Sequence, residues 1–136
     1  MSMHPDDRDA SEHELRTVGP DELAALEAAA ADHGHRVVRL DLADCPDKQV
    51  LLARASAAFA FPDWFGHNWD ALSDSLRDLS WLDAPGYLVV ISSPEAFAAA
   101  QPEIWRTLCE VLSEVERDRE SDDVPWRAVQ TATSLP

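Results

Sequence analysis

The segment Tyr87-Leu88-Val89-Val90-Ile91 is a continuous apolar run of strand length. A strand that is apolar at every position buries both of its faces, which is typical of the centre of a parallel sheet covered on both sides. Strands in such sheets alternate with helices along the chain. This run therefore favours an α/β fold.

The rest of the chain shows the expected alternation of strands and helices. The β-branched and alternating segments 36–42 and 126–131 predict two further strands. Pro, acidic and Gly residues at the ends of Ala- and Leu-rich stretches predict the helices. These helices are expected at 20–33, 46–60, 67–79, 94–100 and 102–119. The sequence therefore predicts an α/β domain with a small three-stranded parallel sheet and helices packed around it.

The 136 residues, 46% of them apolar, are enough for one hydrophobic core. Residues 1–19 are polar and acidic without an apolar period, so we expect a flexible arm there. Residues 20–35 are expected to form an N-terminal helical extension, and residues 36–136 the α/β domain. The three large aromatic residues Trp81, Trp105 and Trp126 are expected to pack in the core.

The charge balance limits the possible partners. Eleven Lys and Arg against 26 Asp and Glu give a net charge of −15. Attraction to nucleic acid or to an anionic membrane is disfavoured, and a partner recognised through charge should be basic. The four glycines are too far apart for a phosphate-binding loop. Two cysteines without CxxC spacing and the absence of a signal-like apolar stretch indicate a cytoplasmic protein.

The segment 67–79 predicts an amphipathic helix. At about 100° per residue, its apolar residues share a sector of roughly 80°. These are Trp69, Leu72, Leu76 and Leu79, and Phe65 from the preceding loop falls in the same sector of the helical wheel. Asp70, Asp74 and Asp78 lie on the opposite side. Like charges four residues apart destabilise a helix by about 0.2–0.5 kcal/mol per pair, so stability does not explain this row.

Two interpretations of the row remain open on this pattern alone. It can be a solvated face of an acidic protein. It can also be an electrostatic docking surface, with Trp64 in the neighbouring Pro- and Gly-containing loop as an aromatic anchor.

Other chemistry has weaker support. His33-Gly-His35 offers two ligands for a metal ion but no third. Asp70 and Asp74 could act as an acid and base pair, but an exposed helix face lacks the desolvation that tunes catalytic carboxyls. We therefore expect no catalytic residues, no metal and no cofactor.

The segment Phe61-Pro-Asp-Trp-Phe-Gly66-His-Asn68-Trp-Asp70-Ala-Leu72-Ser-Asp74-Ser-Leu76 resembles the central segment of the barstar family. Members of this family are intracellular inhibitors of a secreted, guanyl-specific ribonuclease. The order of strands and helices also looks like the family, so the resemblance covers roughly residues 36–132. It implies a barstar-like fold without a cofactor.

The resemblance implies roles for individual residues. Asp74 matches the family's dominant acid, Asp70 its neighbour, and Trp64 the loop aromatic. Asn68 with Gly66 matches the turn that orients the helix, and Glu114 matches a further contact acid. Ser73 stands where the family often has tryptophan, and His67 where an acid is common, so the rim of the partner is expected to differ.

The expected function is stoichiometric inhibition of a basic secreted ribonuclease, in a 1:1 complex, by a bacterial immunity protein that is monomeric when free. The acidic helix and the adjacent loop would block the active site of the enzyme. The alternatives are a barstar-like immunity or interaction module for another basic toxin domain, and an enzyme that uses the two aspartates.

Overall fold

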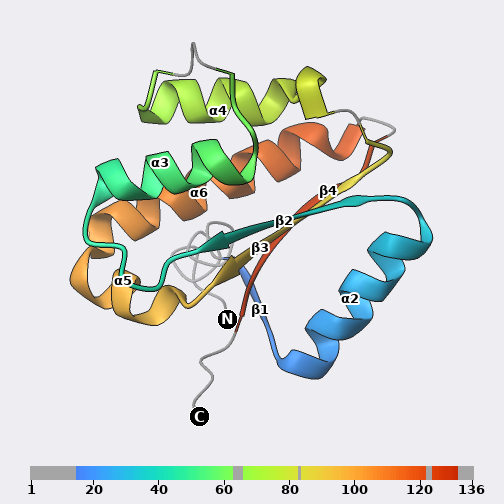
Figure 1. The fold of residues 1–136 in the computed structure, drawn as a ribbon, viewed down its shortest axis with the longest axis horizontal. Helices are drawn as coiled ribbons and strands as arrows, with labels where there is room; N and C mark the ends of the chain where they lie inside the picture. Colours follow the sequence, from blue (N-terminus) through green and yellow to red (C-terminus); the bar gives the residue numbers. More distant parts are fainter. Residues whose placement is uncertain (1–14, 63–65, 83, 122–123, 132–136) are drawn as a thin grey trace, which may run out of the picture.

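The computed structural model describes residues 15–62, 66–82, 84–121 and 124–131. They form an α/β fold, as predicted, around one parallel sheet with the strand order β1-β4-β3-β2 (Figure 1). The strands are β1 (Arg16–Val18), β2 (Arg36–Asp41), β3 (Tyr87–Ser92) and β4 (Trp126–Thr131). The helices are α2 (Pro20–Asp32), α3 (Lys48–Ala58), α4 (Trp69–Asp78), α5 (Pro94–Ala100) and α6 (Pro102–Asp118), with short 3-10 turns at Ser80–Leu82 and Arg119–Ser121.

The apolar run that predicted the central strand is β3. It lies between β2 and β4, and Tyr87 to Ile91 are all buried. Leu88 and Val90 face one side of the sheet, whereas Val89 and Ile91 face the other. Both faces of β3 are covered, as its uniform apolar character predicts.

The sheet has four strands, so the prediction of three is wrong. The additional strand β1 lies within residues 1–19, where we expected an arm that buries little. Leu15 and Val18 are buried against the two faces of the sheet. The sequence hides this strand because Val18, its one apolar residue, and the adjacent Leu15 lie in a polar segment, and two residues do not establish a period. Residues 1–14 lie outside the described part of the chain, and the division into three segments stays a prediction.

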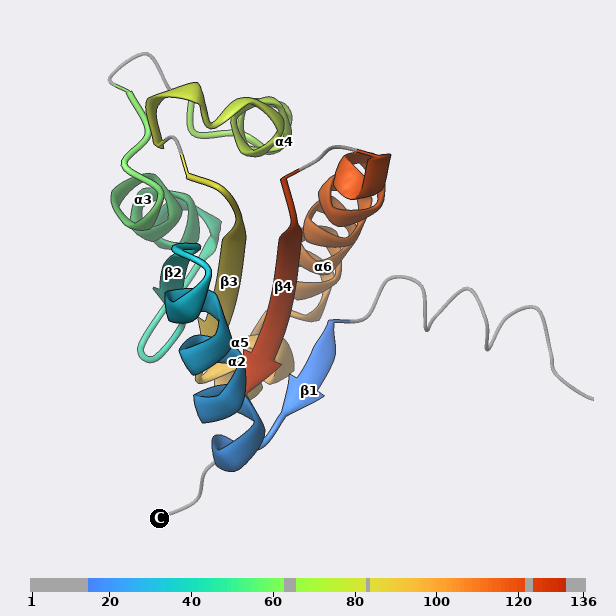
Figure 2. The same ribbon diagram turned by 90° about the vertical axis from the view of Figure 1, so that its right-hand side faces the viewer.

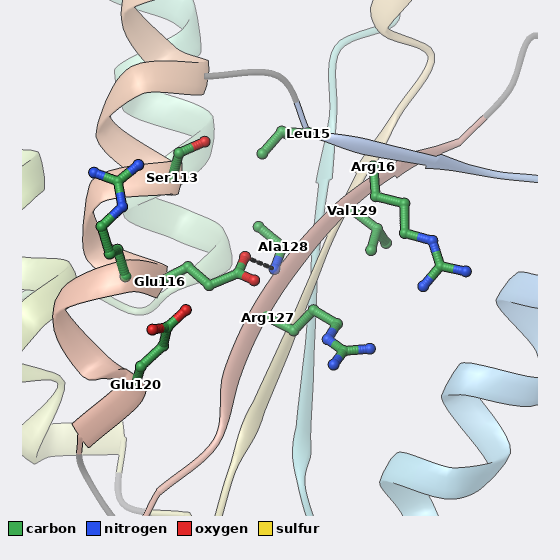
Figure 3. Close-up of a pocket in the computed structure, with 9 residues that line it drawn as sticks. Leu15, Arg16, Ser113, Glu116, Glu120, Arg127, Ala128 and Val129 are labelled. Carbon is green, nitrogen blue, oxygen red and sulfur yellow. Dashed lines mark hydrogen bonds between the residues drawn. The ribbon is translucent and has the colours of Figure 1, made fainter. Parts of the chain in front are cut away.

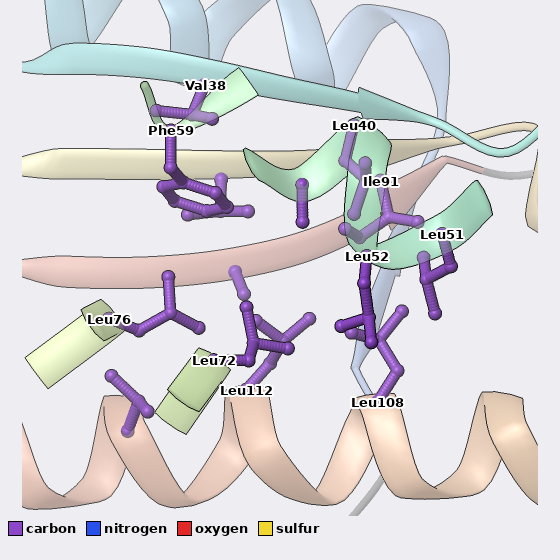
Figure 4. Close-up of a cluster of buried hydrophobic side chains, with 14 of the residues drawn as sticks. Val38, Leu40, Leu51, Leu52, Phe59, Leu72, Leu76, Ile91, Leu108 and Leu112 are labelled. Atoms are coloured by element: carbon purple, nitrogen blue, oxygen red, sulfur yellow. The ribbon is translucent and has the colours of Figure 1, made fainter. Parts of the chain in front are cut away.

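Helices cover the two faces unequally (Figure 2). α3, α4 and α6 pack on one face, and the main apolar core lies between them and the sheet (Figure 4). α2 covers the other face with a smaller cluster that includes Ala30, Leu88, Val90 and Val129. Trp126 is buried in the main core, and Trp81 and Trp105 are partly buried against it, as expected.

The end of α3 positions the loop that leads to α4. Asp47 caps the start of α3, because its Oδ1 accepts the Val50 N–H at 3.0 Å. At the other end Ala60 adopts a left-handed conformation (φ 55°), and the Phe61 N–H reaches back to the Ser56 carbonyl at 2.9 Å. This six-to-one hydrogen bond closes the helix and turns the chain toward residues 62–68.

Candidate functional site: the exposed face of α4

The loop before α4 starts from an aromatic cluster. Phe61 is buried and stacks on Phe59 with ring centroids 5.5 Å apart, and it meets the edge of Trp81 at 5.9 Å. The Trp81 indole N–H also donates to the Phe59 carbonyl at 3.1 Å. The beginning of the loop is therefore fixed to the core. Trp64, the predicted aromatic anchor, lies outside the described residues.

The turn at Gly66–Asn68 starts α4. The Asn68 side-chain oxygen accepts the Ala71 N–H at 2.8 Å, which confirms the predicted N-cap. The Asn68 amide also donates to the Gly66 carbonyl at 3.3 Å. A Cβ on Gly66 would lie 3.1 Å from the Asn68 Nδ2, so a larger residue would crowd the cap. His67 is exposed and has a left-handed φ of 54°.

The inner face of α4 is the predicted apolar face. Leu72, Leu76 and Leu79 are each at most 1% exposed, and Ser75 is buried beside them. Trp69 is half-buried against the core, and the Lys48 ammonium lies 5.9 Å from its ring centroid. Phe65, the remaining member of the predicted face, lies outside the described residues. Burial of this face leaves the opposite face of α4 to the solvent.

Asp70, Asp74 and Asp78 form this outer face, which we call the acidic face, and all three residues are exposed. None of the ion pairs within the described ranges includes any of them. The cation nearest in sequence, Arg77, points elsewhere: its Nε and Nη2 donate to Asp118 Oδ2 at 2.9 and 2.6 Å, and its Nη1 bonds the Ser73 hydroxyl. The three carboxylates therefore face the solvent outside the ion pairs of the described residues.

The adjacent helix α6 adds to this charge. α4 packs against α6, and the two helices run in the same direction (Figure 1). Glu114 precedes Asp118 by one turn of α6, as Ser73 precedes Arg77 by one turn of α4. Because residues four apart share a helix face, exposed Glu114 lies on the side of α6 that meets α4. Its predicted place beside the acidic face is consistent with this geometry.

The end of α4 is held from α6 as well. Leu79 ends the helix in a left-handed conformation (φ 46°), and the Arg119 Nη1 donates to the Leu76 carbonyl at 3.1 Å. Arg119 thus supplies a cationic donor to carbonyls at the helix end, where the helix dipole favours it. Sequence analysis did not identify Asp118 and Arg119 as parts of the site. The only signal was their place in a charged helix end that looks entirely solvated.

The described residues contain no group of three or more His, Cys, Asp or Glu side chains that could hold a metal ion. His33 and His35 have ring centroids 5.5 Å apart, and the His33 Nδ1 contacts the Ala29 carbonyl at 2.9 Å. No helix in the described ranges is long and apolar enough to cross a membrane.

Comparison with known proteins agrees with this geometry. The model of the Barstar (barnase inhibitor) family matches residues 35–130. A comparison with curated proteins found no match. The matched range contains α3, α4, α5, α6, the strands β2 and β3, and all of β4 except Thr131, whereas β1 and α2 precede it. Since the match spans more than half of the chain, this protein belongs to the barstar family of barnase inhibitors.

Proposed function

We propose that this protein is a stoichiometric inhibitor of a secreted, guanyl-specific ribonuclease and that its acidic face covers the active site of that enzyme. The observation that carries the proposal is the exposed row of Asp70, Asp74 and Asp78, which no cation neutralises within the described ranges. Such a row costs about 0.2–0.5 kcal/mol per neighbouring pair. An exposed row of this sign suits a basic partner.

The chemistry of an RNA-cleaving site suits this row. Such a site uses cationic side chains to bind phosphate, and a carboxylate offers the same sign of charge and similar acceptor oxygens. Asp74, in the middle of the row, would occupy the place of an RNA phosphate, with Asp70 beside it. Glu114 would extend the contact from α6. The Trp64 side chain would add an aromatic contact from the loop.

The contacts that hold α4 to its neighbours support tight binding. The Asn68 cap, the Arg77–Asp118 pair and the Arg119 hydrogen bond hold both ends of the helix to its neighbours. A surface that is already ordered loses less conformational entropy on docking. We therefore treat the aspartates as binding groups without a catalytic role. One inhibitor molecule, monomeric when free and cytoplasmic, would bind one enzyme and protect the cell that makes it.

A second candidate function follows from two residues at the rim. Ser73 is partly buried and bonded to Arg77, and His67 is exposed in the turn before α4. Both differ from what is common in the family. A rim of this kind also suits an immunity module for another basic toxin domain, which would use the same acidic face.

Titration calorimetry and an RNA-cleavage assay with barnase as the probe enzyme test the proposal. We expect one-to-one binding with loss of cleavage, weakened strongly by Asp74→Ala and not by Glu95→Ala, which removes an exposed acid on α5. Binding that leaves cleavage intact would contradict active-site coverage. Absence of any binding to barnase would contradict a barnase-type partner and favour the second candidate.

A further inference from the structure

A pocket of about 250 Å³ lies between α2 and the sheet, on the face of the sheet opposite to α4 (Figure 2). It lies where the parallel strands begin, because His35 precedes β2, Tyr87 starts β3 and Pro125 precedes β4. Its other wall is the C-terminal half of α2. The matched family range begins at residue 35, so the pocket depends on a helix that precedes the family domain.

Apolar side chains form two walls of the pocket. Leu26, Ala29 and Ala30 contribute from α2, and Leu88 and Pro125 contribute from the side of the sheet. Leu88 and Ala30 are buried in the small cluster beneath α2. The alanine side chains are short, which leaves room between the helix and the sheet. Because drug-sized ligands need a somewhat larger volume, this pocket suits a small molecule with one apolar group.

The polar lining of the pocket is basic. It consists of His33, His35 and Arg127. The two imidazole rings have centroids 5.5 Å apart, and the contact between the His33 Nδ1 and the Ala29 carbonyl holds the first ring at the end of α2. An imidazole is neutral or positive and a guanidinium is always positive, so this lining carries a net positive charge.

Gly86 makes room for the His35 ring. A Cβ on Gly86 would lie 2.6 Å from the His35 Cδ2 and Nε2, so the ring packs directly on the glycine backbone. Gly86 does not have a positive φ, unlike Gly34, so its backbone conformation does not itself require glycine. The place of His35 in the pocket therefore depends on the absence of a side chain at residue 86.

No acidic side chain lines the pocket, although the chain has 26 Asp and Glu against 11 Lys and Arg. Arg127 is exposed and takes part in no ion pair within the described ranges. It projects from β4 toward the side of α2 and away from Glu116, whose carboxylate accepts the Ala128 N–H at 3.2 Å (Figure 3). The guanidinium is therefore available to a ligand in the pocket.

The turn after α2 reduces the negative potential at the end of this helix. The last carbonyls of a helix carry the negative end of its dipole, which disfavours an anion. Here the His33 N–H donates to the Ala29 and Ala30 carbonyls, both at 3.2 Å, and the His35 N–H donates to the Ala30 carbonyl at 2.8 Å. Backbone donors thus cover the carbonyls nearest to the pocket.

We propose that this pocket binds a small organic carboxylate with an apolar body, such as an aromatic acid. The carboxylate would pair with the Arg127 guanidinium, which offers parallel N–H donors, and the ring would lie between Leu26 and Leu88. An inorganic anion would leave the apolar walls unused, and a neutral molecule would leave Arg127 unpaired. The pocket is separate from the acidic face, so this inference does not depend on the proposed function.

NMR titration of the full chain, followed through its amide signals, tests the proposal with benzoate, benzamide and inorganic phosphate as probes. We expect benzoate to bind with a Kd of about 1 mM or lower and to shift the Gly86 and Leu88 amides. Benzamide lacks the charge and phosphate lacks the ring, so each should bind at least about tenfold more weakly. Equal affinity for benzoate and either other probe, or no binding of benzoate, would overturn the proposal.

Two arginine variants separate the site from the net charge. Arg127→Gln should lower the affinity for benzoate about tenfold, to the level of benzamide, because it removes the partner of the carboxylate. Arg117→Gln removes the same charge from an exposed position on α6 that does not line the pocket, and it should bind benzoate like the unaltered chain. Equal losses in both variants would show a diffuse charge effect and contradict the site.

Two substitutions on α2 test the apolar wall. Ala29 lines the pocket and Ala28 does not, and both are exposed helix positions where leucine is tolerated. Ala29→Leu should fill part of the pocket and weaken benzoate binding at least about tenfold, whereas Ala28→Leu should leave it unchanged. Thermal denaturation checks that both variants are folded. If folded Ala29→Leu bound benzoate as tightly as Ala28→Leu, the ligand would lie elsewhere and the proposal would be wrong.

Discussion

Arg77 on α4 and Asp118 on α6 are 41 residues apart in sequence, and both guanidinium hydrogen bonds of the pair end on a single carboxylate oxygen. The pair fixes the position of α4 and also turns the nearest cation away from Asp74. The Arg77–Asp118 pair therefore both positions the acidic face and leaves its negative charge unscreened by Arg77.

Removing the charge of Asp118 should separate these two effects. The side chains of the pair are 35% and 55% exposed, so Asp118→Asn should lower the free energy of unfolding by less than about 1 kcal/mol. The released Arg77 lies three residues from Asp74 and would partly neutralise it. We expect Asp118→Asn to lower the association rate constant with barnase, measured by stopped flow, more than Glu95→Gln does. Glu95→Gln is the control because it changes the net charge equally at a distance from the acidic face. Equal slowing would mean that Arg77 does not screen the acidic face.

The three aspartates should differ in their effect on binding. A carboxylate buried against cations leaves them unpaired when it is removed, which costs about 2–5 kcal/mol or more, and barnase with barstar is itself a reference case for this range. We expect Asp74→Ala to weaken binding most, Asp70→Ala less, and Asp78→Ala least, in titration calorimetry against barnase. Folding should survive all three changes. Equal losses for Asp74 and Asp78 would show that the row acts only as a diffuse field.

Salt should affect association more than dissociation. A chain with a net charge of −15 steers a basic partner from a distance, and this field is screened within about 8 Å at physiological ionic strength. We expect the association rate constant to fall steeply between low and physiological salt, measured by stopped flow, while the dissociation rate changes less. An association rate that is independent of salt would contradict electrostatic docking.

The cap at Asn68 should stabilise α4 independently of the partner. Asn68→Ala removes the acceptor for the Ala71 N–H and should lower the free energy of unfolding by about 1 kcal/mol in urea denaturation. Asn68→Asp keeps an acceptor oxygen and adds a favourable charge at the helix start, so it should cost much less. If both variants lost equal stability, the stabilising group would be the Asn68 side-chain amide, which donates to the Gly66 carbonyl.

Ala60 offers a stabilising change. Its left-handed φ of 55° costs a residue with a Cβ about 1–2 kcal/mol, and glycine avoids this cost but loses more entropy on folding. We expect Ala60→Gly to raise the free energy of unfolding by about 0.5–1 kcal/mol. Ala57→Gly, inside α3 and also exposed, should lower it by about 1 kcal/mol. A loss in both variants would mean that the left-handed turn is not strained.

Local signals account for what could be predicted from the sequence. The fully apolar run from Tyr87 to Ile91 identified the central strand, and Asn68 marked the start of α4. The helical spacing of Leu72 and Leu76 separated the buried face of α4 from the acidic one. Each of these features depends on residues within one or two turns of each other.

Features that depend on distant partners could not be predicted. Arg77 has neighbouring aspartates on its own helix, and nothing in the sequence indicates that it pairs with Asp118 instead. The strand β1 offers three residues, Arg16–Val18, and becomes a strand only because β4 provides an edge for it. Trp64 lies outside the described residues, so its role in binding, suggested by its loop and by the family resemblance, stays a prediction.

The place of β1 beside β4 has a consequence for biosynthesis. Of the four strands, β1 is translated first and β4 last, yet they are neighbours in the sheet, and the Gln130 side chain bonds the Leu15 carbonyl across 115 residues. During translation, β1 therefore cannot pair with β4 until the residues of β4 have been added to the chain. Contacts of such long sequence separation also slow folding, because a large loop must close before they form. The sheet can be completed only after translation has passed Thr131.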